Sequence, residues 1–355
     1  MKKLFSALAM LAAFALLIAL PDAAAAGVRD ALALCGQVLL PSLFPFFVCS
    51  NLFVLLGFSA RISARFGGAA AKLLRLPEPA GSVFLIGSFG GYPAGAQAAA
   101  LLYEQGELSA SDAERTLAVC NQAGPSFIFG VLGGAVFKNA AAGAFLYAIQ
   151  LLSAVLVCRL TGKRRTEQAR TRAASRPEQT SFAAAFSEAV RRAGMSAIQI
   201  CMFITVFSVC SRYFLIFAGR LLPPELLPMA LGALELSAGC ASLGACGLAP
   251  VWKLCAASVM LGFGGVCILA QSRAAVQSAG LTGRLLLPCK ALQAVLAGTL
   301  TLAAAPALRI ERWCAQTFSG AAAAELPPQI MLLLCACTLL LFHKKYHSIS
   351  SGKHV

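Results

Sequence analysis

Apolar runs long enough to cross a lipid bilayer are the feature of this sequence that most limits its fold. A membrane-spanning helix needs about 20 apolar residues, and runs of roughly this length occupy 139–160, 195–218, 285–308 and 326–342. Only 12% of the residues are charged, whereas soluble domains carry about 25%. So few charged groups cannot cover so apolar a core, and the sequence predicts an all-α, polytopic membrane protein.

Two further apolar runs lie at the N-terminus. Residues 4–20 follow two lysines and precede the sequence PDAAAAG, which fits either an uncleaved first span or a signal peptide with an Ala-x-Ala cleavage site. In both cases we expect the chain to emerge outside near 22–30. Residues 31–56 are then expected to cross inward, with kinks at Pro41 and Pro45.

Basic residues predict the orientation of the spans. The stretch TGKRRTEQARTRAASRPEQTS follows the run at 139–160, and the C-terminus ends in HKKYHSISSGKHV. Lysine and arginine accumulate in cytoplasmic loops, so both segments are expected to be cytoplasmic. The basic residues behind the net charge of +15 cluster in short segments between spans and at the C-terminus, and we therefore expect the bilayer, and not a nucleic acid, as the partner.

Four other apolar stretches are interrupted by glycine or proline and are too short to span unaided. The first half holds GSFGGYPAG and CNQAGPSFIFG, and the second half holds GALELSAGC and MLGFGGVCILAQS. The predicted orientation makes 75–138 run from inside to outside and 220–284 run from outside to inside. Opposed halves with discontinuous helices are typical of inverted-repeat transporters, whose sites form near the bilayer midplane. We predict broken helices or re-entrant hairpins whose tips meet from opposite faces.

The expected organisation follows from these spans and breaks. The chain divides into an N-terminal span or signal-anchor (1–30), a first membrane repeat (31–160), a basic cytoplasmic linker (161–193), a second, inverted membrane repeat (194–308), and a last span with a basic cytoplasmic tail (309–355).

The breaks also supply the candidate binding residues. Irregular backbone at membrane depth is tolerated only where protein or a water-filled cavity surrounds it, and a freed helix N-terminus binds anions. The candidates are the break residues and their polar neighbours: Gly90, Gly91, Tyr92, Pro93, Asn121, Gln122, Gly124, Pro125, Ser126, Glu235, Ser237, Gly264 and Gly265.

Glu235 is the clearest charge in an apolar segment. A charge near the bilayer centre costs at least about 2.5–3.5 kcal/mol. Two roles remain open from the sequence. Glu235 either couples protons to transport, or it is a structural carboxylate that accepts hydrogen bonds from backbone N–H groups of the facing hairpin.

Motifs for other chemistry are missing from the sequence. Most of the 14 cysteines lie in apolar runs, no CxxC pair occurs, and the three histidines are all in the tail. No GxSxG, HExxH or nucleotide-binding glycine loop is present. We therefore expect no metal site, no cofactor and no enzymatic activity.

One long motif resembles a known family. The stretch GSFGGYPAGAQAAALLYEQGELSASDAERTLAVCNQAGPSFIFGVLG resembles the YlbJ-like sporulation integral membrane proteins, within the wider group that carries the nucleoside-recognition, or Gate, domain. The matched pattern is an S-G-Y-P-x-G core, then Y-E-x-G, A-E-R and C-N-x-[AS]-G-P-x-F, and it runs from Ser88 to Phe127. Here Phe89 and Gly90 replace a bare serine-glycine step. ELSAG and GFGG in the second half are also similar to the family, and the likeness covers about residues 30 to 345.

The resemblance implies a protein of an endospore-forming bacterium, located in the cell membrane or the outer forespore membrane. It implies transport of a small organic anion, with dipicolinic acid as the leading candidate, and Tyr92 or Phe127 would flank the aromatic ring. The alternatives are a nucleoside-like solute, since the domain name does not establish the substrate, or a non-transporting membrane scaffold for spore assembly. Association with other spore membrane proteins or with a second copy stays open.

Overall fold

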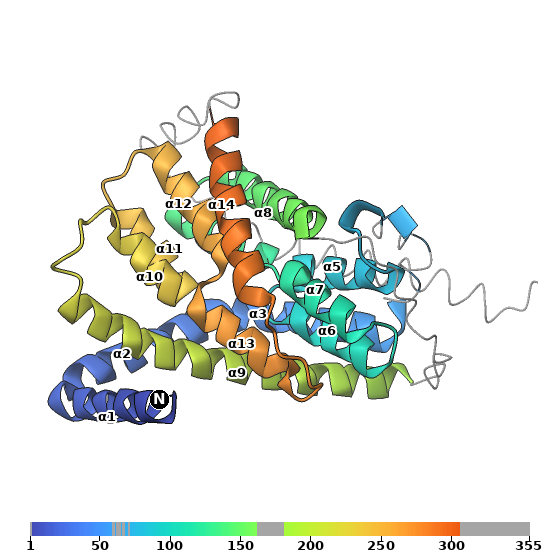
Figure 1. Cartoon of the computed structure of the whole chain (residues 1–355), viewed down its shortest axis with the longest axis horizontal. Coiled ribbons are helices and arrows are strands. Elements are labelled where there is room, and N and C mark those ends of the chain that lie inside the picture. Colours follow the sequence, from blue (N-terminus) through green and yellow to red (C-terminus); the bar gives the residue numbers. More distant parts are fainter. Residues whose placement is uncertain are drawn as a thin grey trace, which may run out of the picture. The chain divides into compact units, whose positions relative to one another are not determined.

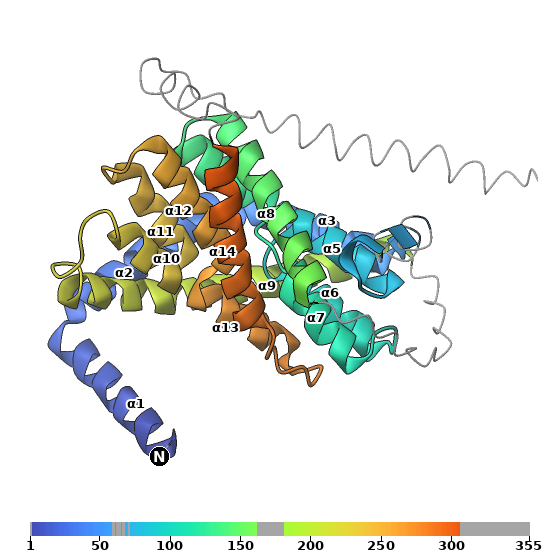
Figure 2. The same ribbon diagram turned by 45° about the horizontal axis from the view of Figure 1, so that its top comes forward.

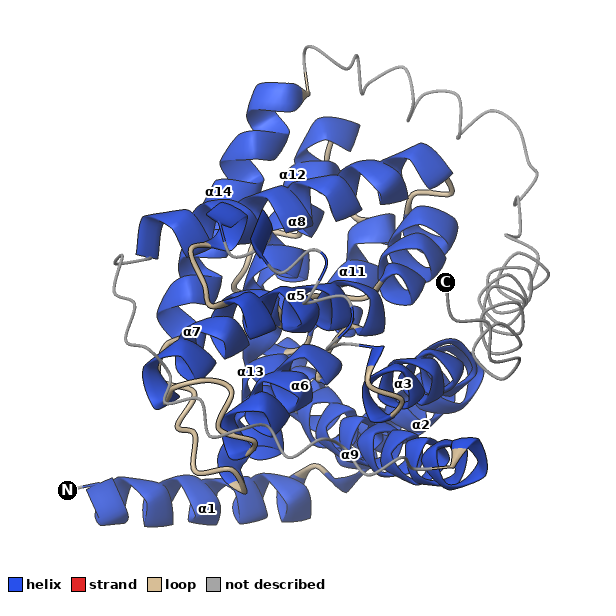
Figure 3. Cartoon of the chain, turned by 90° about the vertical axis from the view of Figure 1, so that its right-hand side faces the viewer, coloured by secondary structure: helices blue, strands red, loops and turns tan. Residues whose placement is uncertain are grey.

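A computed structural model of the chain describes residues 2–58, 61, 65, 68, 69, 72–161 and 181–305. Across these residues every regular element is a helix (Figure 3). Within this described part of the chain, four helices are long and apolar enough to cross a membrane, or five if one bent pair counts as a span. The chain is therefore an all-α, multi-pass membrane protein, as predicted. The last span predicted at 326–342, the basic tail with its cytoplasmic placement, and linker residues 162–180 lie outside the described residues.

The N-terminal part forms a bent pair of helices. α1 (Lys2–Ala19) is followed by α2 (Pro21–Leu34), a π-helical turn η1 (Cys35–Leu39) and α3 (Leu40–Leu55), with a bend of 96° between the segments that flank residue 20. Residues 22–30, where the chain was expected to emerge outside, are helical and belong to α2. Alanine favours the helix, and Pro21 occupies the first turn, where its missing N–H is not needed.

The two halves contain the same series of elements. The first half comprises the continuous helix from α2 to α3, then α5 (Glu78–Gly90), α6 (Ala94–Glu104), α7 (Ala110–Cys120), η2 (Ser126–Val136) and α8 (Ala140–Thr161). The second comprises α9 (Phe182–Phe217), α10 (Leu227–Leu234), α11 (Leu236–Ala245), α12 (Pro250–Phe263), α13 (Gly265–Gln277) and α14 (Leu286–Ala304). Figure 1 shows these helices packed around one another. The predicted linker is thus helical from Phe182 onward, as the start of α9.

The contacts between the halves come in equivalent pairs, in which an element of one half packs on the other half in the same way as its counterpart does. α6 packs on α13 while α11 packs on η2, and α7 packs on α14 while α12 packs on α8. The continuous helix from α2 to α3 packs on α9, and α8 packs on α14. Each of these contacts has a counterpart when the two halves are swapped, which is the pattern that a structural repeat predicts.

Equivalent long helices run in opposite directions. Cys289 at the start of α14 lies beside Thr161 at the end of α8, whereas Gln293, one turn later, bonds to Gln150 and Ser153. The antiparallel course of α8 and α14 is visible in Figure 2. α2 and α9 are also antiparallel. Asp30 pairs with Arg212, whereas Cys35, further along the chain, contacts Cys201, which comes before Arg212. Antiparallel equivalent helices are the arrangement expected of inverted repeats.

Close backbone approaches shape one hairpin in each half. A Cβ atom on Gly87 of α5 would lie 1.6 Å from the carbonyl oxygen of Cys120, and one on Gly95 of α6 would lie 2.4 Å from the same oxygen. A Cβ on Gly239 of α11 would lie 2.3 Å from the Cα of Gly232 in α10. Only glycine fits at these positions. The chain therefore reverses tightly between α5 and α6 and between α10 and α11, and each arm is too short to span alone.

The second interrupted stretch of each half is not a hairpin. α12 and α13 together form a 28-residue candidate span, Pro250–Gln277, that is interrupted at Gly264. Its counterpart is α7 followed by η2, which are separated by a non-helical segment at 121–124. Each half thus contributes one helical hairpin and one interrupted helix.

Candidate functional site

All four predicted interruptions are present in the structure. α5 ends at Gly90 and α6 begins at Ala94, and residues 121–124 separate α7 from η2. Glu235 separates α10 from α11. Gly264 separates α12 from α13 in a left-handed conformation, with φ at 84°. Glycine adopts this conformation without the steric cost that other residues incur.

A small cavity lies where the interruptions converge. Its volume is about 50 Å³, and both halves line it. The hairpin tips contribute Gly91 and Tyr92 from the first half and residues 235–237 from the second. Gly124 and Gln271 come from the two interrupted helices. Leucine and isoleucine side chains of the long antiparallel helices complete the wall: Leu39, Leu43, Ile200 and Ile204.

The cavity is too small to hold an organic ligand in this conformation. A buried water needs about 10–15 Å³ of such space, so the cavity has room for only a few waters. Pockets that hold small organic ligands are typically about 300–1,000 Å³. The site is therefore closed around its centre in this conformation.

Five of the thirteen predicted residues line the cavity: Gly91, Tyr92, Gly124, Glu235 and Ser237. Gly90 and Pro93 are buried in the first hairpin tip behind it, and Pro125 and Ser126 are half-buried at the start of η2.

The remaining four predicted residues lie around this wall. A Cβ on Gly264 would lie 3.3 Å from the Tyr92 hydroxyl oxygen, and one on Gly265 would lie 2.8 Å from the Gly232 carbonyl oxygen. Asn121 and Gln122 are fully buried but belong to a separate polar network. The structure thus brings the predicted residues into one region without making all of them cavity walls.

Glu235 caps the second arm of its own hairpin. Its carboxylate oxygens accept hydrogen bonds from the backbone N–H groups of Ser237, at 2.9 Å, and Ala238, at 2.7 Å. The predicted bonds to the facing hairpin are therefore wrong, because the carboxylate binds the nearest freed N–H groups, which belong to α11. This cap neutralises the positive end of α11.

A buried polar network lies next to the cavity and centres on Lys290 of α14, which is 1% exposed. Its ammonium group donates to the main-chain oxygen of Asn121, at 2.5 Å, and to Oε1 of Gln293, at 2.9 Å. Gln293 Nε2 in turn donates to Oε1 of Gln122 at 2.8 Å and to the main-chain oxygen of Gln150 at 3.2 Å. This network joins α7, α8 and α14.

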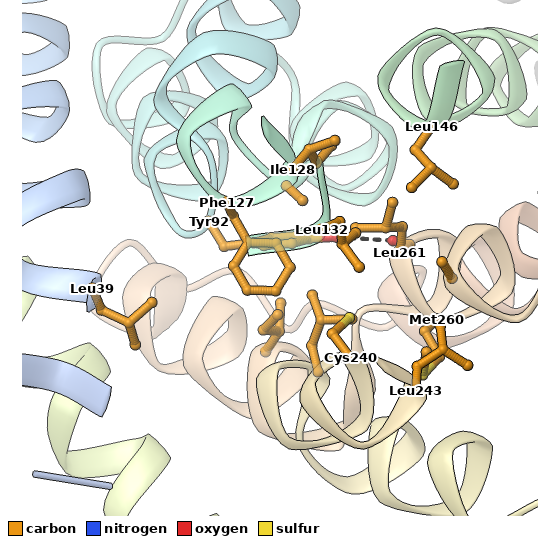
Figure 4. Packing of buried hydrophobic residues seen from close by; sticks show 14 of the residues in the cluster. Leu39, Tyr92, Phe127, Ile128, Leu132, Leu146, Cys240, Leu243, Met260 and Leu261 are labelled. Atoms are coloured by element: carbon orange, nitrogen blue, oxygen red, sulfur yellow. Dashed lines mark hydrogen bonds between the residues drawn. The ribbon is translucent and has the colours of Figure 1, made fainter. Parts of the chain in front are cut away.

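Tyr92 connects the network to the cavity. Its ring lies 5.5 Å from the Lys290 nitrogen, within the range of a cation–π interaction. Its hydroxyl donates to the main-chain oxygen of Leu261 in α12, at 3.3 Å (Figure 4). Tyr92 therefore contacts α12 and α14 of the second half, and Phe127 lies beside it in Figure 4.

The sequence interpretation missed Lys290 and Gln293. The signal was present, because Lys290 is the only charged residue in the apolar helix 286–304, and an ionisable residue inside a span is a functional candidate by default.

Glu114 is a second polar residue outside the predicted set, and it joins the two halves. In the first turn of its helix, Ser109 caps α7 by accepting the Asp112 N–H at 3.1 Å. Glu114, however, reaches across to the other half. Its Oε1 accepts the backbone N–H groups of Thr282, at 2.6 Å, and Gly283, at 3.0 Å. It thereby fastens α7 to the connection between α13 and α14.

Comparison with known proteins gives one relative. No protein-family profile matches the chain, and no solved structure matches it. A protein of Bacillus subtilis (strain 168) named "Sporulation integral membrane protein YlbJ" is 25% identical over 291 residues, which is 72% of this chain and 71% of the relative. The wider nucleoside-recognition group stays a prediction. Over most of its length, this chain is therefore similar to a sporulation integral membrane protein.

Proposed function

We propose that this protein is a secondary carrier or facilitator for a small organic anion, with dipicolinate as the leading candidate, in the membrane around the developing spore. The observation that carries the proposal is the convergence of two hairpin tips and two interrupted helices, from antiparallel halves, on one cavity. The sporulation role is carried over from the name of the Bacillus subtilis relative.

Helix ends at the cavity support an anionic substrate. α6 begins just after Tyr92, η2 begins next to Gly124, and α13 begins just before cavity residue Ile268. Freed N–H groups and the positive end of the helix dipole stabilise anions at such positions. Tyr92 and Phe127 line the same cavity and offer faces for an aromatic ring.

Entry of the substrate requires the hairpins to move. A cavity of about 50 Å³ holds no dicarboxylate, so the closed form is one state of a cycle in which the tips separate toward one side or the other. In the proposed cycle the Glu114 contact with residues 282–283 holds one end of the halves together. Whether Glu235 also carries a coupling proton is part of the proposal, beside its capping role.

The direct test is uptake of labelled dipicolinate into lipid vesicles that contain the purified protein. We expect saturable uptake that excess unlabelled dipicolinate inhibits and nucleosides do not. Inhibition by nucleosides would favour a nucleoside-like substrate. Absence of uptake of either solute would overturn the carrier proposal and favour a scaffold.

Substitutions at the interruptions should abolish transport. Gly91 has φ at 76°, and a Cβ there would lie 2.9 Å from the Gly124 nitrogen, so Gly91→Leu should block the meeting of the first hairpin with α7–η2. Pro93→Leu and Asn121→Leu alter the same tip and the facing break. We expect each variant to lose dipicolinate loading in spores and uptake in vesicles while still inserting in the membrane.

The matched control is Gly130→Leu, because no atom lies within 4 Å of a Cβ at this position of η2. This variant should retain transport. Normal loading with all three tip variants would contradict the proposed passage.

A further inference from the structure

We infer that the interruption in the first half forms a cation site, and that the ammonium group of Lys290 is its permanent occupant. In discontinuous helices of membrane transporters, unwound main-chain carbonyls and the C-terminal ends of half-helices hold dissolved cations such as Na⁺. Here the same kinds of ligand hold a side chain of the protein itself. This inference concerns cation binding and does not depend on the identity of any transported solute.

The ligands of the Lys290 ammonium are neutral oxygens at the end of a half-helix. α7 ends at Cys120, and Asn121 is the first non-helical residue. The Asn121 main-chain oxygen lies 2.5 Å from the Lys290 nitrogen, and the Gln293 amide oxygen lies 2.9 Å from it. The C-terminal end of a helix carries partial negative charge and favours a cation.

No carboxylate pairs with this ammonium in the described part of the chain, since none lies within 4.0 Å of the Lys290 nitrogen. A buried charge needs compensation from hydrogen bonds or polar groups. The compensation comes from carbonyl dipoles and from the Tyr92 ring, at 5.5 Å. The environment is therefore that of a bound monovalent cation and differs from that of a salt bridge.

Oxygen acceptors are in surplus around the site. Asn121 Oδ1 and Gln150 Oε1 are both buried and accept no hydrogen bond from a described residue. Asn121 supplies a ligand of Lys290, and Gln150 is bonded to Gln293. An excess of acceptors over donors in a buried region lowers the free energy of a cation held there.

At the equivalent interruption in the second half, a neutral group supplies the hydrogen bond. There the main-chain oxygen of Leu261, near the end of α12, accepts the hydroxyl of Tyr92. Each interrupted helix thus receives a donor from the opposite half, but only the first receives a cation. The protein therefore has no need of dissolved Na⁺ at this break, and its stability should not depend on Na⁺.

The test removes the resident cation and supplies a soluble one. Lys290→Ala deletes the atoms of an n-propylammonium ion, so this ion fits the space that the substitution creates. The measurement is the unfolding temperature Tm of the full-length protein in lipid nanodiscs. We expect Lys290→Ala to lower Tm by about 5 °C or more, and n-propylammonium to restore Tm in a saturable manner.

Three controls separate a cation site from simple cavity filling. Propan-1-ol has nearly the same size but no charge, and it should not restore Tm. Lys253→Ala removes a half-buried lysine whose ammonium donates to the Gly244 carbonyl, and its Tm should not respond to n-propylammonium. The wild-type Tm should be equal in sodium and choline chloride.

The inference fails if propan-1-ol restores Lys290→Ala as well as n-propylammonium does, if neither does, or if Na⁺ specifically raises the wild-type Tm. If Lys290→Ala is recovered unfolded, the comparison moves to expression yield. Recovery of folded variant only when n-propylammonium is present supports the site. Wild-type yield and Tm for the neutral variant Lys290→Met would contradict it.

Discussion

Gly87→Ala is expected to disrupt the packing of the first hairpin on α7 and to lower the free energy of unfolding by about 3 kcal/mol or more. The new Cβ would lie 1.6 Å from the Cys120 carbonyl oxygen. This oxygen belongs to the backbone and has no free rotation, so α5 itself must shift. Gly239→Ala should have a comparable effect in the second half, since its Cβ would lie 2.3 Å from the Gly232 Cα. Both effects are measured as a decrease in Tm of the purified protein.

The matched control for this prediction is Gly194→Ala in α9, where a Cβ meets no atom within 4 Å. Alanine favours a helix over glycine by about 0.5–1 kcal/mol, so this variant should unfold at the wild-type temperature or slightly above it. A wild-type Tm for both Gly87→Ala and Gly239→Ala would show that the hairpins are not closed as described.

Gln293→Leu is expected to destabilise the protein by about 3 kcal/mol, because it leaves several buried polar groups without partners. The amide oxygen of Gln293 accepts from Lys290, at 2.9 Å, and its nitrogen donates to Gln122 and Gln150, at 2.8 and 3.2 Å. Leucine fills a similar volume, so loss of polar contacts and not a cavity dominates the change.

Thermal unfolding of Gln293→Leu is compared with that of Thr299→Val on the same helix. Thr299 is exposed, and its hydroxyl donates only to carbonyl oxygens within α14. This control should change Tm little. Equal Tm values for Gln293→Leu and the wild type would mean that the network around Lys290 does not hold α7, α8 and α14 together.

The interruptions were predictable from sequence because their causes are local. Gly91 and Gly264 both adopt positive φ, and glycine or proline in an apolar segment signals a break. The long spans were predictable for a similar reason, since α8 begins and ends within one residue of the run at 139–160. Which breaks form hairpins was not predictable, because this depends on contacts such as the approach of Gly87 to Cys120.

The Lys290 network and the Glu114 contact join residues that are distant in sequence. Lys290 meets Asn121 across 169 positions, and Glu114 meets Thr282 across 168, so no periodicity could indicate these pairs. The hydropathy of 286–304 could have shown that Lys290 required a partner, but not which one. The helix over 22–30 has a local cause, because the segment PDAAAAGVRDALAL is rich in alanine, which favours a helix.

The central claim is that the cavity between the two halves opens to both sides of the membrane. It is tested most directly by side-specific labelling of Ser237→Cys, in a cavity wall, with a membrane-impermeant thiol reagent in vesicles of known orientation. Peptide mapping distinguishes position 237 from the native thiols, and Ser272→Cys, which replaces a fully buried side chain outside the cavity, is the control. The account predicts labelling at 237 from either side, slowed by dipicolinate, and no labelling at 272. Protection of position 237 from both sides, or labelling that dipicolinate does not alter, would contradict it.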